Sequence, residues 1–146
     1  MDWVLQKATE LGISEITPLF TERTEVKLKG ERLEKKMQHW QQVMISACEQ
    51  CGRNRLPKLN PANALETWQT PTSALNLVLH HRSTQSLTNH PKPAATTLII
   101  GPEGGLSEEE IRTLLEEKTC HALTLGPRIL RTETAPIVAL STVQHL

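Results

Sequence analysis

The segment 98–111 constrains the fold more than any other part of this chain. Its first residues, 98–100, are an apolar run that suits a buried strand. A turn rich in glycine and proline follows, and glycine there lets the backbone come close to a bound molecule without a Cβ in the way. Ser107 and Glu110 then have the spacing of a capping box, which starts a helix. Such a strand, turn and helix place a ligand crevice at the carboxyl end of a sheet strand.

Helical and strand patterns alternate along the whole chain. Apolar residues recur at helical spacing in the segments 2–11, 31–51, 107–118 and 132–146. Strand patterns fall at 13–20, 75–79, 96–100 and 121–125, with a further short strand compatible with 53–61. One or two helical turns suit 63–68, and 83–95 has the polar composition of a loop. This alternation predicts one α/β domain with a mostly parallel sheet flanked by helices.

The charge balance and the aromatic content limit the kinds of partner. The chain carries 16 Lys and Arg against 16 Asp and Glu, so no overall basic field points to nucleic acid. Aromatic residues make up 3% of the chain, which argues against a base-stacking platform for single-stranded RNA. Recognition of RNA by shape, or of one splayed base, stays open. A polyanion site would have to be a local cluster of arginines.

The cysteine pattern argues against a metal or redox site. Cys48, Cys51 and Cys120 are an odd set without a secretory context, which predicts reduced thiols in the cytoplasm. The apolar runs are too short to span a bilayer, and the charged N-terminal segment is not a signal peptide. Zinc would need four ligands, and Cys120 beside His121 has no paired partner nearby. The C-x-x-C pair ends a helix instead of opening one, so we expect no metal and no redox motif.

Loops that follow predicted strands are the candidate ligand site. They lie at 80–83, 101–106 and 126–131, and two of them combine glycine with proline. Backbone groups of such turns suit a flat heterocycle such as adenine, although Gly-Pro pairs also simply make tight turns. The chain has neither a G-x-x-x-x-G-K-[ST] phosphate loop nor a G-x-G-x-x-G after its first strand. A nucleoside-like ligand without a triphosphate is therefore favoured.

Two further segments concentrate polar residues. Segment 123–135 places Arg128, Arg131 and Glu133 between a strand and a helix. Two guanidinium groups beside a ligand loop favour an anionic substrate, because arginine makes planar bidentate contacts with phosphate. The alternative is a helix cap with surface arginines. Segment 48–55 is either a polar helix end that faces substrate or a solvated helix terminus.

Together these motifs resemble the RsmE family. They are LIIGPEGGLS at 98–107, LTLGPRILRTETA at 123–135 and ACEQCGRNR at 47–55, and the start of the chain through Arg23 is similar as well. The family consists of bacterial methyltransferases that act on uridine N3 of 16S ribosomal RNA. Membership implies a homodimer with the SPOUT fold, in which a deep C-terminal trefoil knot binds S-adenosylmethionine. It also implies that residues 1–146 are the SPOUT methyltransferase domain, without the family's N-terminal β-rich RNA-binding domain.

The resemblance assigns the cofactor to the loops after the strands. The residues expected to contact S-adenosylmethionine are Leu79, His80, Ile100, Gly101, Glu103, Gly104, Gly105, Leu125, Gly126, Ile129 and Leu130. Those expected to bind 16S rRNA, within an assembled small subunit, are Arg23, Glu49, Gln50, Arg53 and Arg128.

The expected catalytic residues are Arg131, Glu133 and Arg128. Arg131 is the first candidate for a cation that favours the uridine anion, while Arg128 would contact the RNA. Either Glu133 or His80 would accept the N3 proton. The competing hypothesis is a non-catalytic RNA- or ribosome-binding module on the same fold.

Overall fold

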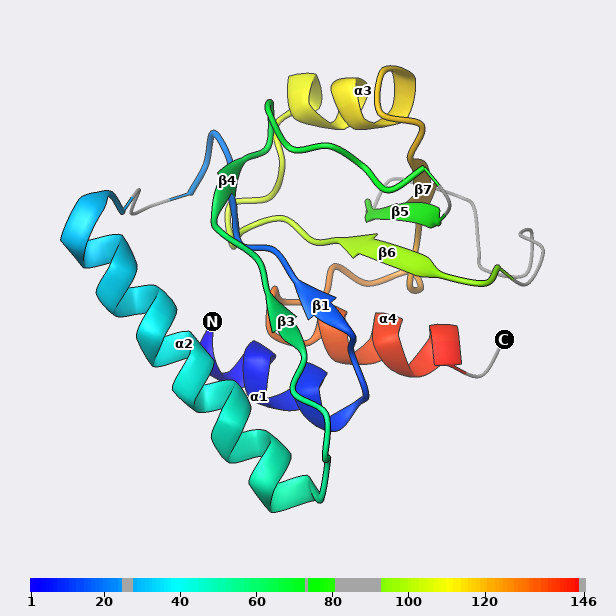
Figure 1. Cartoon of the computed structure of the whole chain (residues 1–146). Coiled ribbons are helices and arrows are strands. Elements are labelled where there is room, and N and C mark those ends of the chain that lie inside the picture. The colour runs from blue at the N-terminus through cyan, green and yellow to red at the C-terminus, as the bar shows by residue number, and fades with distance from the viewer. Residues whose placement is uncertain (25–27, 73, 81–92, 145–146) are drawn as a thin grey trace.

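A three-stranded parallel sheet forms the centre of the computed structural model (Figure 1). Strand β5 (Leu75–Leu79) lies between β6 (Thr96–Ile99) and β7 (His121–Leu123). The predicted α/β class and the parallel sheet are therefore confirmed. The structure describes residues 1–24, 28–72, 74–80 and 93–144, so the predicted loop 83–95 lies mostly outside the described residues.

Helices cover both faces of this sheet (Figure 1). Helix α3 (Glu108–Glu116) lies on one face and α4 (Ala135–Gln144) on the other. Successive side chains of a strand point to opposite faces. Val78 of β5 accordingly belongs to the cluster that contains Leu114 of α3, and its neighbour Leu77 to the cluster with Val143 of α4. Burial on both faces explains why apolar residues follow one another at 77–79 in β5 and at 98–99 in β6.

A second part of the molecule combines two helices with very short strands. Helix α1 (Asp2–Glu10) packs against the long helix α2 (Gly30–Cys51), mainly through Leu5, Trp40 and Met44. The strands form two parallel pairs, β1 (Glu15–Ile16) with β3 (Lys58–Leu59) and β2 (Leu19–Phe20) with β4 (Asn63–Ala64). Strand β2 leads into the turn that carries Arg23, and so helps to set the position of that arginine.

Helices α1 and α2 end at or within one residue of the predicted ends, residues 11 and 51. Gly12 and Gly52 follow them with φ values of +86° and +79°, which lie in the left-handed region that glycine readily adopts. At Gly52 the N–H donates to Cys48 O, so the cap also satisfies a carbonyl of the last turn. The chain can then reverse its direction towards β3.

The prediction of one continuous strand over residues 13–20 is wrong. This segment is divided into β1 and β2, which pair with different strands. Pro18 lies between the two and has no N–H to donate to a ladder. The break changes the pairing partner of the chain just before the turn that carries Arg23.

Residues 63–68 also differ from the predicted helical turns. They begin as strand β4, in which the N–H groups of Asn63 and Leu65 donate to Pro18 O and Phe20 O. A single helix-like turn follows, closed by the Trp68 N–H on the carbonyl of residue 64. Pairing with β2 and burial of Leu65 therefore outweigh the local propensity.

The last strand and the last helix are shorter than predicted. β7 ends at Leu123 instead of residue 125, and α4 begins at Ala135 instead of residue 132. The N–H groups of Thr134 and Ala135 both donate to Arg131 O, so a turn precedes the helix. Pro136 lies in the first turn of α4, where no intrahelical donor is needed.

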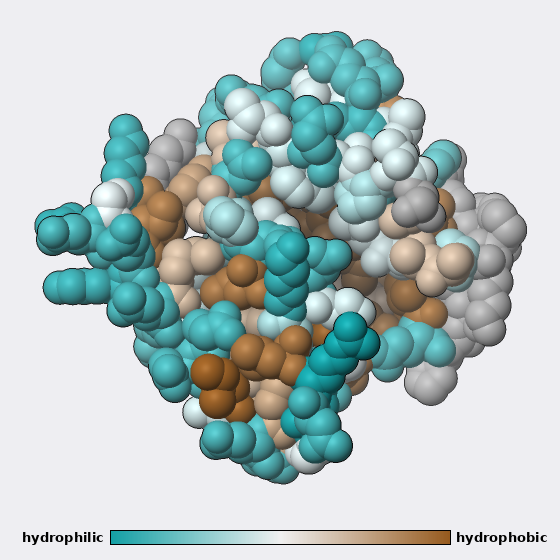
Figure 2. Space-filling view, in the orientation of Figure 1, coloured by the Kyte–Doolittle hydropathy of each residue, from teal (hydrophilic) through white to brown (hydrophobic). Residues whose placement is uncertain are grey.

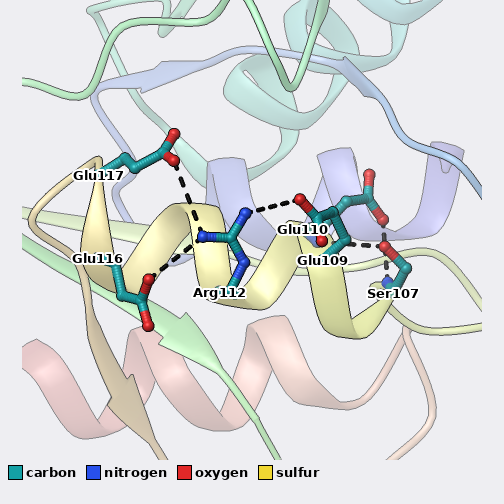
Figure 3. A network of polar contacts seen from close by, with 6 residues as sticks. All are labelled: Ser107, Glu109, Glu110, Arg112, Glu116 and Glu117. Carbon is teal, nitrogen blue, oxygen red and sulfur yellow. Dashed lines mark hydrogen bonds and ion pairs between the residues drawn. The ribbon is translucent and has the colours of Figure 1, made fainter.

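Helix α3 begins with the predicted capping box (Figure 3). The Glu110 N–H donates to Ser107 Oγ at 3.2 Å, and the Ser107 N–H donates to Glu110 Oε1 at 3.0 Å. Further along the helix, Arg112 lies among the carboxylates of Glu109, Glu116 and Glu117. These exposed ion pairs contribute little to stability. The capping box, by contrast, fixes the point at which the preceding loop becomes a helix.

The outer sides of α2 and α3 are largely hydrophilic in the view of Figure 2. On α2 the exposed positions include Glu34, Lys35 and Gln38, which lie on one side of the helix. None of the helices among the described residues has the length and the hydropathy that crossing a bilayer requires.

Replacement of Leu114 by alanine should lower the free energy of unfolding by about 2–5 kcal/mol, because Leu114 is fully buried between α3 and the sheet. Urea unfolding followed by circular dichroism measures this change. The matched control is Leu56→Ala, at a residue that is 41% exposed, with an expected change below about 0.5 kcal/mol. Equal effects of both substitutions would contradict the described packing.

Candidate functional site

A cavity of about 460 Å³ opens where the central strands end. Leu79 and Leu123, the last residues of β5 and β7, contribute to its wall, as does Ile100 directly after β6. The carboxyl ends of parallel strands meet at one edge of a sheet, and loops that leave this edge enclose ligands. Most of the wall comes from two such loops, the glycine loop (residues 101–106) and the basic loop (residues 124–133).

Most of the residues predicted to contact the cofactor lie in this cavity wall. They are Leu79, His80, Ile100, Gly101, Glu103, Gly104, Gly105, Leu125, Ile129 and Leu130. Gly126 does not line the cavity, and its carbonyl accepts a hydrogen bond from Thr124 Oγ1 within the basic loop. Arg128, Arg131 and Glu133 line the same cavity, so the structure brings the predicted cofactor and catalytic residues together. Their individual roles stay predictions.

The glycine loop is folded back so tightly that two of its positions need glycine. The Gly105 N–H donates to Pro102 O at 2.8 Å, and Gly105 has a φ of +77°. A Cβ on Gly101 would lie 2.9 Å from Leu106 Cγ and 3.1 Å from Leu106 N. No side chain fits there without a shift of the loop. Backbone groups therefore form this wall of the cavity.

The basic loop presents its side chains to solvent. Ile129 is 77% exposed, and the side chains of Arg131 and Glu133 are 86% and 55% exposed. Arg131 Nη1 lies 3.9 Å from Glu133 Oε1. An ion pair this open contributes little to stability. The fold does not require the pair, and both groups lie at the cavity where a substrate can reach them.

Arg23 joins the cavity from a distant part of the sequence. It lies in the arginine turn (residues 21–24), and its Nη1 donates to Gly104 O at 3.0 Å. With Arg128 and Arg131 it provides three positive side chains in the wall, against the two carboxylates of Glu103 and Glu133. Such a set suits an anionic group. The sequence did not predict the contact of Arg23 with the glycine loop, and its binding of RNA stays a prediction.

Three other residues predicted to bind RNA are not part of the cavity wall. Glu49 and Gln50 are exposed near the end of α2. Arg53 Nη1 donates to Thr9 O at 2.8 Å and so joins the end of α2 to α1. The sequence pattern gave no sign of this structural contact. Binding of RNA by these three residues stays a prediction.

Several residues of the wall were not singled out from the sequence. They are Pro102, Leu106, Ile111, Leu123, Thr124, Thr132 and Ala135. All but one adjoin or lie within the two motifs, so their position beside the glycine- and arginine-rich segments was the available signal. The exception, Ile111, is the last residue of the segment 98–111 and lies one helical turn after Ser107, and the helical period could have assigned it to the cavity.

The cysteines form no common site. Cys48 and Cys120 are buried, Cys51 is exposed, and all three are free thiols. Burial raises the pKa of the Cys120 thiol to about 11, although nearby Lys118 acts in the opposite direction. Among the described residues, no group of three or more His, Cys, Asp or Glu side chains is arranged to hold a metal ion.

Thiol labelling should separate the cysteines by reactivity. At about pH 8, a pKa near 11 leaves roughly one Cys120 thiol in a thousand ionised, and only the thiolate reacts. Iodoacetamide should therefore modify exposed Cys51 first, and the rate at Cys120 should rise as the pH increases towards 11. Mass spectrometry of peptides after timed labelling measures both rates. Equal labelling of the two in the folded protein would contradict the burial of Cys120.

Comparison with known protein families gives a match over nearly the whole chain. The model of the RNA methyltransferase domain family matches residues 1–144. A protein of Buchnera aphidicola subsp. Schizaphis graminum named Ribosomal RNA small subunit methyltransferase E is 37% identical over 147 residues, which cover 99% of this chain and 59% of that protein. The protein of the same name from Mesomycoplasma hyopneumoniae is 37% identical over 142 residues, 96% of this chain and 62% of its own length.

Solved structures give the same result. A Legionella pneumophila protein in complex with the bound cofactor SAM has a TM-score of 0.93 and 47% identity, over 99% of this chain and 60% of that one. Ribosomal RNA small subunit methyltransferase E of Neisseria gonorrhoeae, bound to S-adenosyl methionine, has a TM-score of 0.90 and 38% identity at the same coverage. The chain thus spans about 60% of the length of these relatives.

Proposed function

Because the chain belongs to the RNA methyltransferase domain family, we propose that it transfers a methyl group from S-adenosylmethionine to N3 of a uridine in 16S ribosomal RNA. The family membership expected from the motifs at 98–107 and 123–135 is confirmed. The observation that carries the proposal is the cavity at the carboxyl edge of the central sheet. Relatives with the same architecture and up to 47% identity were solved with S-adenosylmethionine bound.

The cavity has the features that a methyl-donor nucleoside needs. Leu79, Ile100 and Leu125 give apolar surface for an adenine ring, and the glycine loop lets backbone carbonyl and N–H groups approach a ligand. We assign cofactor contacts to the cavity residues named above, and keep Gly126 as a residue that shapes the basic loop. Bound there, S-adenosylmethionine would supply an electrophilic methyl group.

The residues around the cavity suit activation of a uridine. The N3–H of uracil must lose its proton before N3 can attack, and a nearby cation favours the anion. Arg131 would lie beside the uracil oxygens, and Arg128 would contact the RNA backbone. Glu133 or His80, which also line the cavity, would accept the proton. Correct orientation of N3 towards the methyl group would supply much of the remaining acceleration.

We extend the proposal to architecture and partners. Residues 1–146 would form one SPOUT domain whose C-terminal part makes a deep trefoil knot, an arrangement rare among proteins. The protein would act as a homodimer on assembled small ribosomal subunits, in the cytoplasm. The names of the relatives support the small ribosomal subunit as the substrate, and the fold and the dimer are what the family resemblance implies.

Calorimetry with S-adenosylhomocysteine and ATP tests the cavity assignment. The protein should bind the former and not the latter, because it lacks a phosphate loop. Gly101→Ala should weaken S-adenosylhomocysteine binding by about tenfold or more, since the added Cβ displaces the loop. Gly104→Ala is the matched comparison with a smaller expected loss, because its Cβ would meet Arg23 Cβ at an ordinary 3.4 Å. Unchanged affinity in Gly101→Ala would remove the glycine loop from the binding site.

Arg131→Ala should lower the methylation rate on small ribosomal subunits by about a hundredfold, the typical effect of losing one group that stabilises developing charge. Binding of S-adenosylhomocysteine should change less than about threefold, since the side chain is assigned to the uridine and not to the cofactor. Mass mapping of the methylated nucleotide gives the position and the rate. Arg112→Ala, an exposed arginine on α3 that does not line the cavity, is the control. Absence of methylation even by a version extended to the length of its relatives would favour the non-catalytic binding module.

A further inference from the structure

Two chain segments that are far apart in the sequence are held together at the mouth of the cavity. On one side, Arg23 Nη1 of the arginine turn donates to Gly104 O of the glycine loop at 3.0 Å. On the other side, the Glu22 N–H donates to Glu110 Oε2 of helix α3 at 3.0 Å. Neighbouring residues of one turn thus contact both the glycine loop and the helix that follows it.

Glu110 contacts the arginine turn through the carboxylate oxygen that takes no part in the capping box. Its Oε1 accepts the Ser107 N–H, and Figure 3 shows the side chain turned back towards Ser107 at the start of the helix. Its Oε2 accepts the Glu22 N–H. A carboxylate offers both oxygens as acceptors, whereas an amide offers one. Glutamate at this position therefore does more than cap α3.

The arginine turn is itself well ordered by internal hydrogen bonds. The Thr24 N–H donates to Thr21 O, and the Thr21 N–H donates to Thr24 Oγ1 at 2.9 Å. Thr21 is buried and directly follows β2. With one end fixed by the strand pair, the contact to Glu110 sets how the turn lies against the glycine loop. That placement decides where the Arg23 guanidinium enters the cavity wall.

We propose that Glu110 is a positioning residue of the methyltransferase site, which holds the arginine turn through the Glu22 N–H and so places Arg23 across Gly104. The inference rests on the proposed function. In this proposal the second carboxylate oxygen of Glu110 affects the site through the position of Arg23. This effect does not depend on the capping box, which uses the other oxygen.

Two substitutions remove this one hydrogen bond from opposite ends. Glu110→Gln keeps one acceptor oxygen for the capping box and replaces the other by an NH₂ group that cannot accept the Glu22 N–H. Glu22→Pro removes the donor, and the second position of a four-residue turn is the one that proline favours. Glu22→Ala keeps the N–H and is the control for the side chain. Glu117→Gln, at the residue that directly follows α3, is the control for a lost charge near this helix.

Glu110→Gln and Glu22→Pro should each weaken S-adenosylhomocysteine binding by about tenfold in the full chain, through displacement of the loop. Glu22→Ala and Glu117→Gln should stay within about twofold of the unaltered protein. In an Arg23→Ala background, Glu110→Gln should cause no further loss, because both changes interrupt the same link. A further tenfold loss in that background, or normal affinity in Glu22→Pro, would overturn the proposal.

Hydrogen exchange separates this inference from the proposed function, because it needs no ligand. Glu110→Gln and Glu22→Pro should both raise amide exchange in residues 21–24 and 101–106, while the core strand β5 keeps its protection. Ser107→Ala, which removes a cap and spares the Glu22 contact, should affect mainly the first turn of α3. If the unaltered protein bound no S-adenosylhomocysteine, the proposed function would fail while the exchange result still reported on the link. Unchanged exchange in both segments would overturn the positioning role itself.

Discussion

The parallel pairing of β5 with β6 and β7 is the constraint on which the rest of the structure depends. It brings the carboxyl ends of three strands to one edge, so that the glycine loop and the basic loop leave the sheet beside each other. Leu77 and Val78 have no exposed surface, and their opposite directions hold α4 and α3 on the two faces. These helices in turn fix the far ends of both loops. A cavity walled largely by backbone turns is therefore a consequence of how the sheet packs.

The cavity has two kinds of wall, one apolar and one positively charged. Apolar residues at the strand ends and a glycine loop without side-chain obstruction provide shape, which an uncharged ring system needs. Charge is supplied by arginines at the opening, of which Arg131 is almost fully solvated. Exposed cations attract a polyanion from solution, whereas their exposure makes them of little use for stability. A chain without net charge can in this way present a local positive site.

Prediction from the sequence succeeded where a structural feature depends only on residues that are neighbours in the chain. The capping box of Ser107 and Glu110 needs only two side chains and the backbone between them, and it forms as expected. Prediction failed where a distant strand competes with local preference. Residues 63–68 start as a strand because β2 offers them a ladder and Leu65 gains burial there. Local patterns also do not encode the contacts of Arg53 and Arg23 with partners 44 and 81 residues away, whereas the binding of RNA by these two arginines stays a prediction.

The sequence by itself determined the α/β class, the strand–turn–helix units and the family, because periodicity, capping and glycine positions are properties of short segments. Only the tertiary structure decided that Arg23 contacts the glycine loop and that one carboxylate oxygen of Glu110 is shared with a turn 88 residues earlier. The physical reason is that these contacts depend on the order of strands in the sheets and on the faces that the helices cover. Strand order and helix placement result from packing of the whole chain, and no single segment contains them.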